Sequence, residues 1–166
     1  MRRAFTLTRR RAFTLIELII SIGMIAILFS FSSLNHLSLQ RKTTLSEQTK
    51  TISSDLRAQQ IKAMTGDTGG SGTVSDYGVY LGSNAYTLFK GSTYNPADPG
   101  NYQISLPPTL TLMDITFINS QIVFQKGSGE ILNFSNIANT FGVNDSALNG
   151  SKTFILNALG VITQIQ

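Results

Sequence analysis

The dominant feature of the hydropathy pattern is an apolar run from Ala12 to Leu34, interrupted by a single charge at Glu17. About 20 helical residues cross the hydrocarbon core of a bilayer, so this run is long enough to span a membrane. A carboxylate inside such a segment costs about 2.5–3.5 kcal/mol on insertion scales, which makes Glu17 a candidate functional residue. The pattern therefore predicts a transmembrane helix over residues 13–34.

After the apolar run the pattern changes, but nothing interrupts the helix. Neither proline nor glycine occurs between Gly23 and Gly66. Residues 35–44 are polar, and beyond them apolar or small side chains recur at helical spacing on one face: Leu45, Thr49, Ile52, Leu56 and Ala63. Such a stripe needs a surface to pack on. We therefore expect an amphipathic continuation over residues 35–65 that ends at Gly66 and carries a folded head.

Residues 66–166 have the pattern of an antiparallel β-sheet. Segments 77–81 and 85–89 flank Gly82-Ser83-Asn84, which predicts a hairpin. The segment from Gly142 to Gly150 is interpreted as a polar excursion between strands. Further strands are expected at 102–106, 110–115, 121–125, 153–157 and 161–165.

These elements predict an α+β protein in which one antiparallel sheet packs on the second half of a long N-terminal helix. We expect four parts: a basic N-terminal segment at 1–12, a transmembrane helix at 13–34, an amphipathic continuation at 35–65, and a β-rich head at 66–166.

The composition argues against an enzyme or a metalloprotein. The chain has no cysteine, so neither a disulfide nor a thiolate metal site is possible, and His36 is its only histidine. A Ser/His/Asp constellation is therefore not expected, and we predict no cofactor. Asn144-Asp145-Ser146 offers oxygen ligands for calcium, but the acidic residues of the head match no EF-hand spacing.

The formal net charge of +4 is concentrated in the leader, which holds five arginines before Ala12. After Met64 the chain has three lysines against six acidic residues, so a basic nucleic-acid footprint is not expected on the head. Positive residues beside a membrane helix stay in the cytoplasm. We therefore expect a single-pass protein of the inner membrane, with its N-terminus inside and its head periplasmic or extracellular.

The basic leader, the small Ala12 and the segment Phe13-Thr14-Leu15-Ile16-Glu17 resemble the N-terminus of type IV pilins and type II secretion pseudopilins. The resemblance implies that a prepilin peptidase cuts between Ala12 and Phe13 and methylates the new amine of Phe13. The family usually has glycine before the cut, so Ala12 departs from its pattern.

The resemblance also implies a role for Glu17, which in the family neutralises the N-terminal amine of a neighbouring subunit in the filament core. The alternative from the residues alone is a glutamate that lies at the membrane interface and gains about 0.3–1 kcal/mol from the helix dipole.

By this resemblance the chain is a structural subunit, a minor one, of a pilus-like or pseudopilus filament. Its partners would be other subunits, bound through the N-terminal helix, the prepilin peptidase and an inner-membrane assembly platform. The head is similar to H-type minor pseudopilins in the segments 54–64, 77–81 and 122–129.

Other functions stay open. One alternative is a DNA-uptake pilin, which needs a basic or aromatic strip, and another is a membrane-anchored exported domain that never assembles and has no use for Glu17. The residues around Arg10 partly match a twin-arginine signal, and the residues around Ser32 partly match a signal-peptidase site. The apolar run is longer than the typical apolar region of such signals and contains a charge.

Overall fold

A computed structural model describes residues 14–147 and 149–166, without the side chains of residues 30–43. It has an N-terminal helix followed by antiparallel sheets, which confirms the predicted α+β class. The chain divides between Gln40 and Arg41 into two units, and the second of these holds the sheets.

The helix α1 spans Leu15–Thr65 and ends where the sequence predicted. Gly66 takes the left-handed conformation, with φ of 69°. Its N–H donates to the carbonyl of Ala63 at 3.3 Å, and the N–H of Asp67 donates to the carbonyl of Lys62 at 3.0 Å. These two bonds form a Schellman motif, so Gly66 satisfies the last helical carbonyls and turns the chain into the head.

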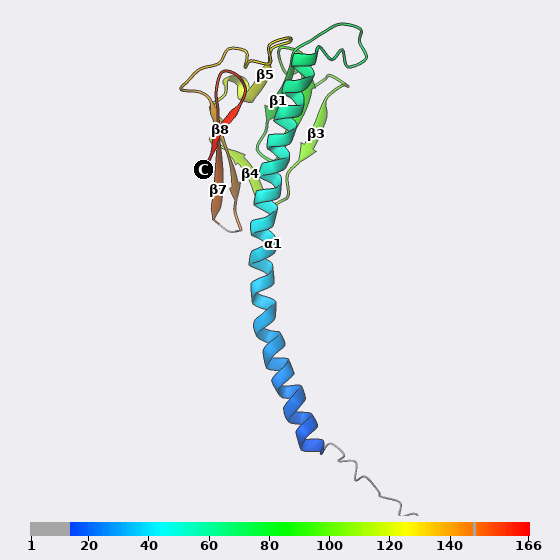
Figure 1. The fold of residues 1–166 in the computed structure, drawn as a ribbon, viewed down its shortest axis with the longest axis vertical. Helices are drawn as coiled ribbons and strands as arrows, with labels where there is room; N and C mark the ends of the chain where they lie inside the picture. The colour runs from blue at the N-terminus through cyan, green and yellow to red at the C-terminus, as the bar shows by residue number, and fades with distance from the viewer. Residues whose placement is uncertain (1–13, 148) are drawn as a thin grey trace, which may run out of the picture. The chain divides into compact units, whose positions relative to one another are not determined.

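The head contains two four-stranded sheets, so the expectation of a single sheet was wrong (Figure 1). The first has the order β3-β2-β1-β5 and the second β4-β6-β7-β8, with all neighbouring strands antiparallel. Pro107 and Pro108 lie between β3 and β4 and lack the N–H groups that a hairpin ladder requires, so β4 leaves the first sheet and joins the second. The strands are β1 Tyr77–Leu81, β2 Ala85–Lys90, β3 Tyr102–Ser105, β4 Leu110–Met113, β5 Gln121–Phe124, β6 Thr140–Asp145, β7 Gly150–Leu156 and β8 Ile162–Ile165.

The strand β6 includes the first four residues of the segment Gly142 to Gly150 that was interpreted as a polar excursion, and for those residues the interpretation was wrong. Phe141, Val143 and Asp145 alternate along β6 and are all buried. The ring of Phe141 stacks on that of Phe154 in β7, with centroids 4.5 Å apart. Gly142 and the polar Asn144 and Asp145 hid this alternation in the sequence. β6 lies between β4 and β7 in the second sheet.

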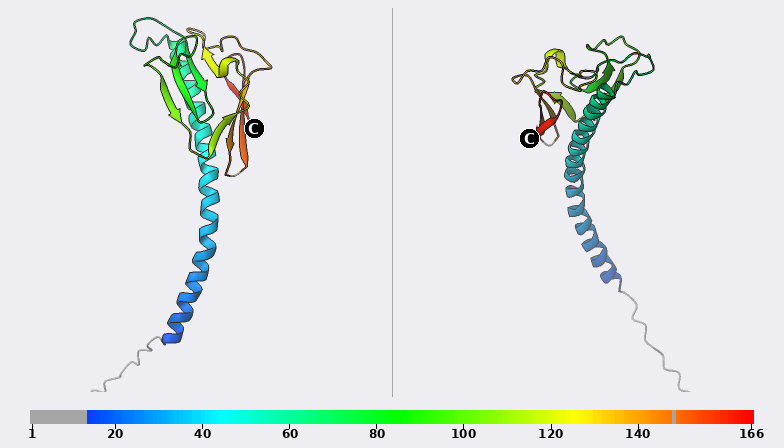
Figure 2. Two further views of the ribbon diagram at one scale, coloured as in Figure 1. Left: turned by 180° about the vertical axis from the view of Figure 1, so that it is seen from behind. Right: turned by 45° about the horizontal axis from the view of Figure 1, so that its top comes forward.

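The predicted apolar stripe of α1 is buried in the head, as expected. Ile52, Leu56 and Ala63 are at most 2% exposed and belong to the same core cluster as residues of both sheets. Figures 1 and 2 show this part of α1 lying along β1. Burying a large aliphatic side chain contributes about 1.5–3 kcal/mol, so the stripe supplies a substantial part of the stability of the head.

Hydrogen bonds fix the same part of α1 to the strands and turns. The side-chain Nε2 of Gln60 donates to the carbonyls of Gly129 at 3.0 Å and Leu159 at 2.6 Å. The hydroxyl of Tyr86 in β2 donates to Oδ2 of Asp55 at 2.6 Å. These directional hydrogen bonds hold the helix in one register on the sheets. Apolar packing alone is not directional and fixes the register less tightly.

Candidate processing and assembly site

The first turns of α1 have an apolar surface that is exposed on every side. Between Leu15 and Phe29 the large apolar side chains are 52–78% exposed. A helix that is apolar all round is normally buried in a large core or in a membrane. This surface therefore needs a cover of lipid or of other apolar helices.

Glu17 lies in the first turn of this helix and is exposed. The hydroxyl of Thr14 donates to Oε2 of Glu17, and the N–H of Glu17 donates to Oγ1 of Thr14, both at 3.4 Å. Thr14 precedes the first helical residue, so the two residues form a loose version of a capping box. The carboxylate is thereby held beside the helix N-terminus, where the dipole also favours a negative charge.

This local role of Thr14 was missed in the sequence, although the signal was present. Thr-x-x-Glu in front of an apolar run is a capping-box pattern. The hydroxyl of Ser21 also forms its hydrogen bond within the helix, where it donates to the carbonyl of Glu17 at 2.7 Å. Glu17 is thus the one charged group on the exposed apolar segment from Thr14 to Phe29.

The proposed cut lies just before this turn. Ala12 and Phe13 are outside the described residues, so the structure adds no geometry for cleavage or methylation. In the part of the chain that is described, no helix is both long and apolar enough to qualify as a membrane span.

Glu17 at the start of an exposed apolar helix, behind the arginines that precede Ala12 in the sequence, agrees with the expected prepilin-type N-terminus. The model of the prokaryotic N-terminal methylation motif matches residues 7–33, which include Ala12, Phe13 and Glu17. The N-terminal segment thus carries a pilin-like signal for prepilin processing, as the sequence indicated. Comparison with curated proteins and with solved structures gives no match. The motif does not reach the head, whose similarity to H-type minor pseudopilins stays a prediction.

The polar groups buried in the head have structural roles. Burial, and then the hydrogen bond to Asp55, raise the pKa of Tyr86 well above its usual value of 10. The carboxylate of Asp145 is 1% exposed, and its Oδ1 accepts the N–H of Ala147 at 2.9 Å, within the turn after β6. Across the described residues, no cluster of three or more His, Cys, Asp or Glu side chains is placed to hold a metal ion.

Proposed function

We propose that this protein is a structural subunit, a minor one, of a type IV pilus-like filament or a type II secretion pseudopilus. The observation that carries the proposal is the match of the methylation motif to residues 7–33. Prepilin peptidase cuts between Ala12 and Phe13 and methylates the amine of Phe13. Residues 1–12 are then the removed leader and residues 13–34 the segment that first crosses the inner membrane, with the N-terminus inside.

The exposed apolar surface of α1 supports assembly through this helix. An assembly platform in the inner membrane transfers the subunit from lipid into the filament, so that other apolar helices replace the lipid around it. Within such a core the carboxylate of Glu17 pairs with the methylated amine of a neighbouring subunit. The pairing offsets the cost of burying two charges, because removal of either partner leaves the other unpaired.

The remaining parts of the chain follow from this role. Residues 35–65 continue the helix out of the core, and residues 66–166 form the head that the filament displays in the periplasm or at the cell surface. Three lysines against six acidic residues after Met64 argue against a DNA-uptake role for that head.

Processing is tested by the mass and the N-terminal peptide of the protein purified from its native membrane. We expect a chain that begins at Phe13 and carries one methyl group on its amine. An Ala12→Gly variant, which restores the usual residue of the family, should be cut at the same bond and at least as fast. A mature terminus near Ser32, or a leader that is never removed, would contradict the proposal.

A further inference from the structure

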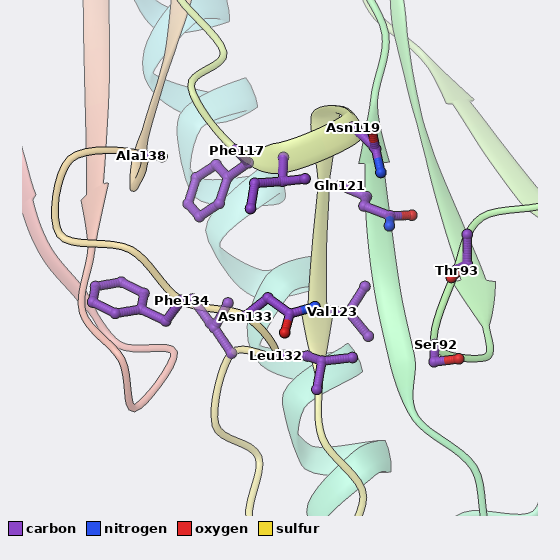
Figure 3. A pocket seen from close by; sticks show the side chains of 12 residues that line it. Ser92, Thr93, Phe117, Asn119, Gln121, Val123, Leu132, Asn133, Phe134 and Ala138 are labelled. Atoms are coloured by element: carbon purple, nitrogen blue, oxygen red, sulfur yellow. The ribbon is translucent and has the colours of Figure 1, made fainter.

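A cavity of about 150 Å³ lies beside β5 in the head (Figure 3). Ile122 and Phe124 of β5 are fully buried in the core, so Gln121 and Val123 lie on the opposite face of this strand and line the cavity. Two other parts of the chain complete the wall: the short 3₁₀ turn η1, Ile118–Ser120, and the loop 131–138. The cavity is open to solvent, because Ile118 of η1 is 57% exposed and Asn133 of the loop is also exposed, so a ligand can be held in it in part.

The lining is polar without being charged. Three side-chain carboxamides reach it, those of Asn119, Gln121 and Asn133, together with the hydroxyls of Ser92 and Thr93. The Oε1 of Gln121 accepts the N–H of Tyr94 at 2.9 Å. Asn119 and Asn133 are exposed, and within the described chain no side-chain hydrogen bond engages their carboxamides. Each free carboxamide offers two donor hydrogens and an acceptor oxygen to a ligand.

The apolar part of the wall comes from Phe117, Val123 and Ile131, whose side chains are largely buried. A few polar groups placed around an apolar and aromatic wall are typical of sites for small organic ligands. Because no charged side chain lines the cavity, an ionic ligand would gain no partner of opposite charge here. The chemistry therefore favours a neutral ligand with several hydrogen-bonding groups.

The backbone beside the cavity is not free to bind an extended peptide. Phe124 of β5 forms an antiparallel bridge with Ile131, and the N–H of Leu132 donates to the carbonyl of Val123 at 2.8 Å. The edge of β5 is thus already paired with the loop, so a peptide cannot add to it as a further strand. A ligand in this cavity is therefore held by side chains.

We propose that this cavity binds one ring of a neutral carbohydrate. The carboxamides of Asn119 and Asn133, and the free Nε2 of Gln121, hydrogen-bond its hydroxyl groups, while Phe117 and Val123 contact its apolar face. The site lies wholly in the head and its ligand binding does not depend on filament assembly.

The backbone allows clean variants. Asn119 and Asn133 have φ angles of 53° and 57°, in the left-handed region that glycine adopts readily. Asn119→Gly and Asn133→Gly therefore delete the carboxamides while keeping the turns. Asn149→Gly is the matched control, because Asn149 has φ of 49° and does not line the cavity. Ala138→Leu fills part of the cavity by a different route.

The experiment uses the full chain in a detergent without a sugar headgroup, and saturation-transfer NMR with D-glucose, D-galactose, D-mannose and N-acetyl-D-glucosamine as probes. We expect at least one sugar to bind with a Kd of about 1–10 mM, the range for a small ligand with few contacts. The Asn119→Gly/Asn133→Gly double variant and Ala138→Leu should each weaken binding at least tenfold, and Asn149→Gly should leave it unchanged.

Several results would overturn the proposal. These are the absence of binding by all four sugars, an equal loss in Asn149→Gly, or undiminished binding in both the double variant and Ala138→Leu. Binding of N-acetylalanine methylamide, a peptide-bond probe, with no sugar bound would assign the cavity to peptides instead. Thermal unfolding of each variant checks that the head remains folded.

Discussion

The two ends of α1 bury their apolar side chains in different ways. From Leu15 to Phe29 every large apolar side chain is at least half exposed. Near the C-terminal end, Ile52 and Leu56 are at most 2% exposed. The N-terminal end is apolar on all sides, whereas the C-terminal end has one buried apolar stripe and mostly polar residues elsewhere. An all-round apolar helix requires cover on all sides, but a stripe requires only one folded surface.

The comparison shows where each end finds its partner. The head supplies the partner of the C-terminal end within the same chain, and that end is fixed by hydrogen bonds as well as by packing. The N-terminal end leaves its apolar surface, and Glu17, exposed within the described chain, where the proposed filament would cover them. Substitutions at one end should therefore affect assembly, and substitutions at the other should affect stability.

The largest effect is expected at Glu17, where Glu17→Leu should be inserted in the membrane and cut before Phe13 but fail to enter filaments. Its loss leaves the methylated amine of the neighbouring subunit unpaired in an apolar core. Sheared-filament recovery and crosslinking beside the parent chain measure this. Ser21→Ala should be nearly silent, because that hydroxyl bonds only within its own helix turn.

Two further variants separate the charge of Glu17 from its contact with Thr14. Glu17→Gln keeps an oxygen that accepts the hydroxyl of Thr14, whereas Thr14→Ala removes that hydroxyl and keeps the charge. If the charge matters, Glu17→Gln fails like Glu17→Leu and Thr14→Ala assembles. The opposite pattern would show that Glu17 acts only as a helix cap.

At the other end of α1, Leu56→Asp should unfold the head. The change places an unpaired carboxylate at a position 2% exposed and removes a core side chain, a loss of about 3–5 kcal/mol. Thermal unfolding of the full chain in detergent, followed by near-UV circular dichroism, measures it. Ile61→Asp is the control on the same helix, because Ile61 is 48% exposed. An unchanged Tm in Leu56→Asp would refute the docking of the stripe.

The adjacent residues Gln59 and Gln60 on α1 allow a comparison between a buried side-chain amide that forms hydrogen bonds and one whose oxygen forms none. Gln60 donates to the carbonyls of Gly129 and Leu159, while the Oε1 of Gln59 is buried with no hydrogen-bond partner among the described residues. Gln60→Leu should lower the free energy of unfolding by about 1–3 kcal/mol, because the buried carbonyl of Gly129 and the partly buried carbonyl of Leu159 lose their donor. Gln59→Met should be neutral or stabilising by up to about 1 kcal/mol. Equal effects in denaturant unfolding would contradict this distinction.

The smallest effect concerns Tyr86 and depends on pH. Burial, with the bond to Asp55, raises the pKa of Tyr86 in the folded state, so its contribution to stability is fully present below about pH 10 and is lost as the pH rises further. Tyr86→Phe should lower the free energy of unfolding by about 1–2 kcal/mol at pH 7 and by less at pH 11.

Tyr80→Phe is the control for that prediction, since the ring of Tyr80 stacks on Tyr94 and its loss of a hydroxyl leaves the stacking in place. Denaturant titrations at pH 7 and pH 11 compare the variants. A difference between Tyr86→Phe and the parent that stays constant across this range would show that Tyr86 does not carry the alkaline dependence.

Local patterns in the sequence determined the elements with short-range causes. The helix end at Gly66, the hairpin around Gly82-Ser83-Asn84 and the buried stripe through Leu56 all follow from conformational preference or from periodicity. The motif around Phe13 and Glu17 could also be recognised from the sequence, because it consists of consecutive residues.

Only the tertiary structure decided features that depend on distant segments. β6 is a buried strand because β4 and β7 flank it, although its own residues look polar. The division into two sheets follows from which strands pair after Pro107 and Pro108. Asn119 and Asn133 line one cavity only because η1 and the loop 131–138 meet beside β5. Such contacts join residues far apart in the chain, and neither propensity nor periodicity within a segment encodes which distant segment will pack against it.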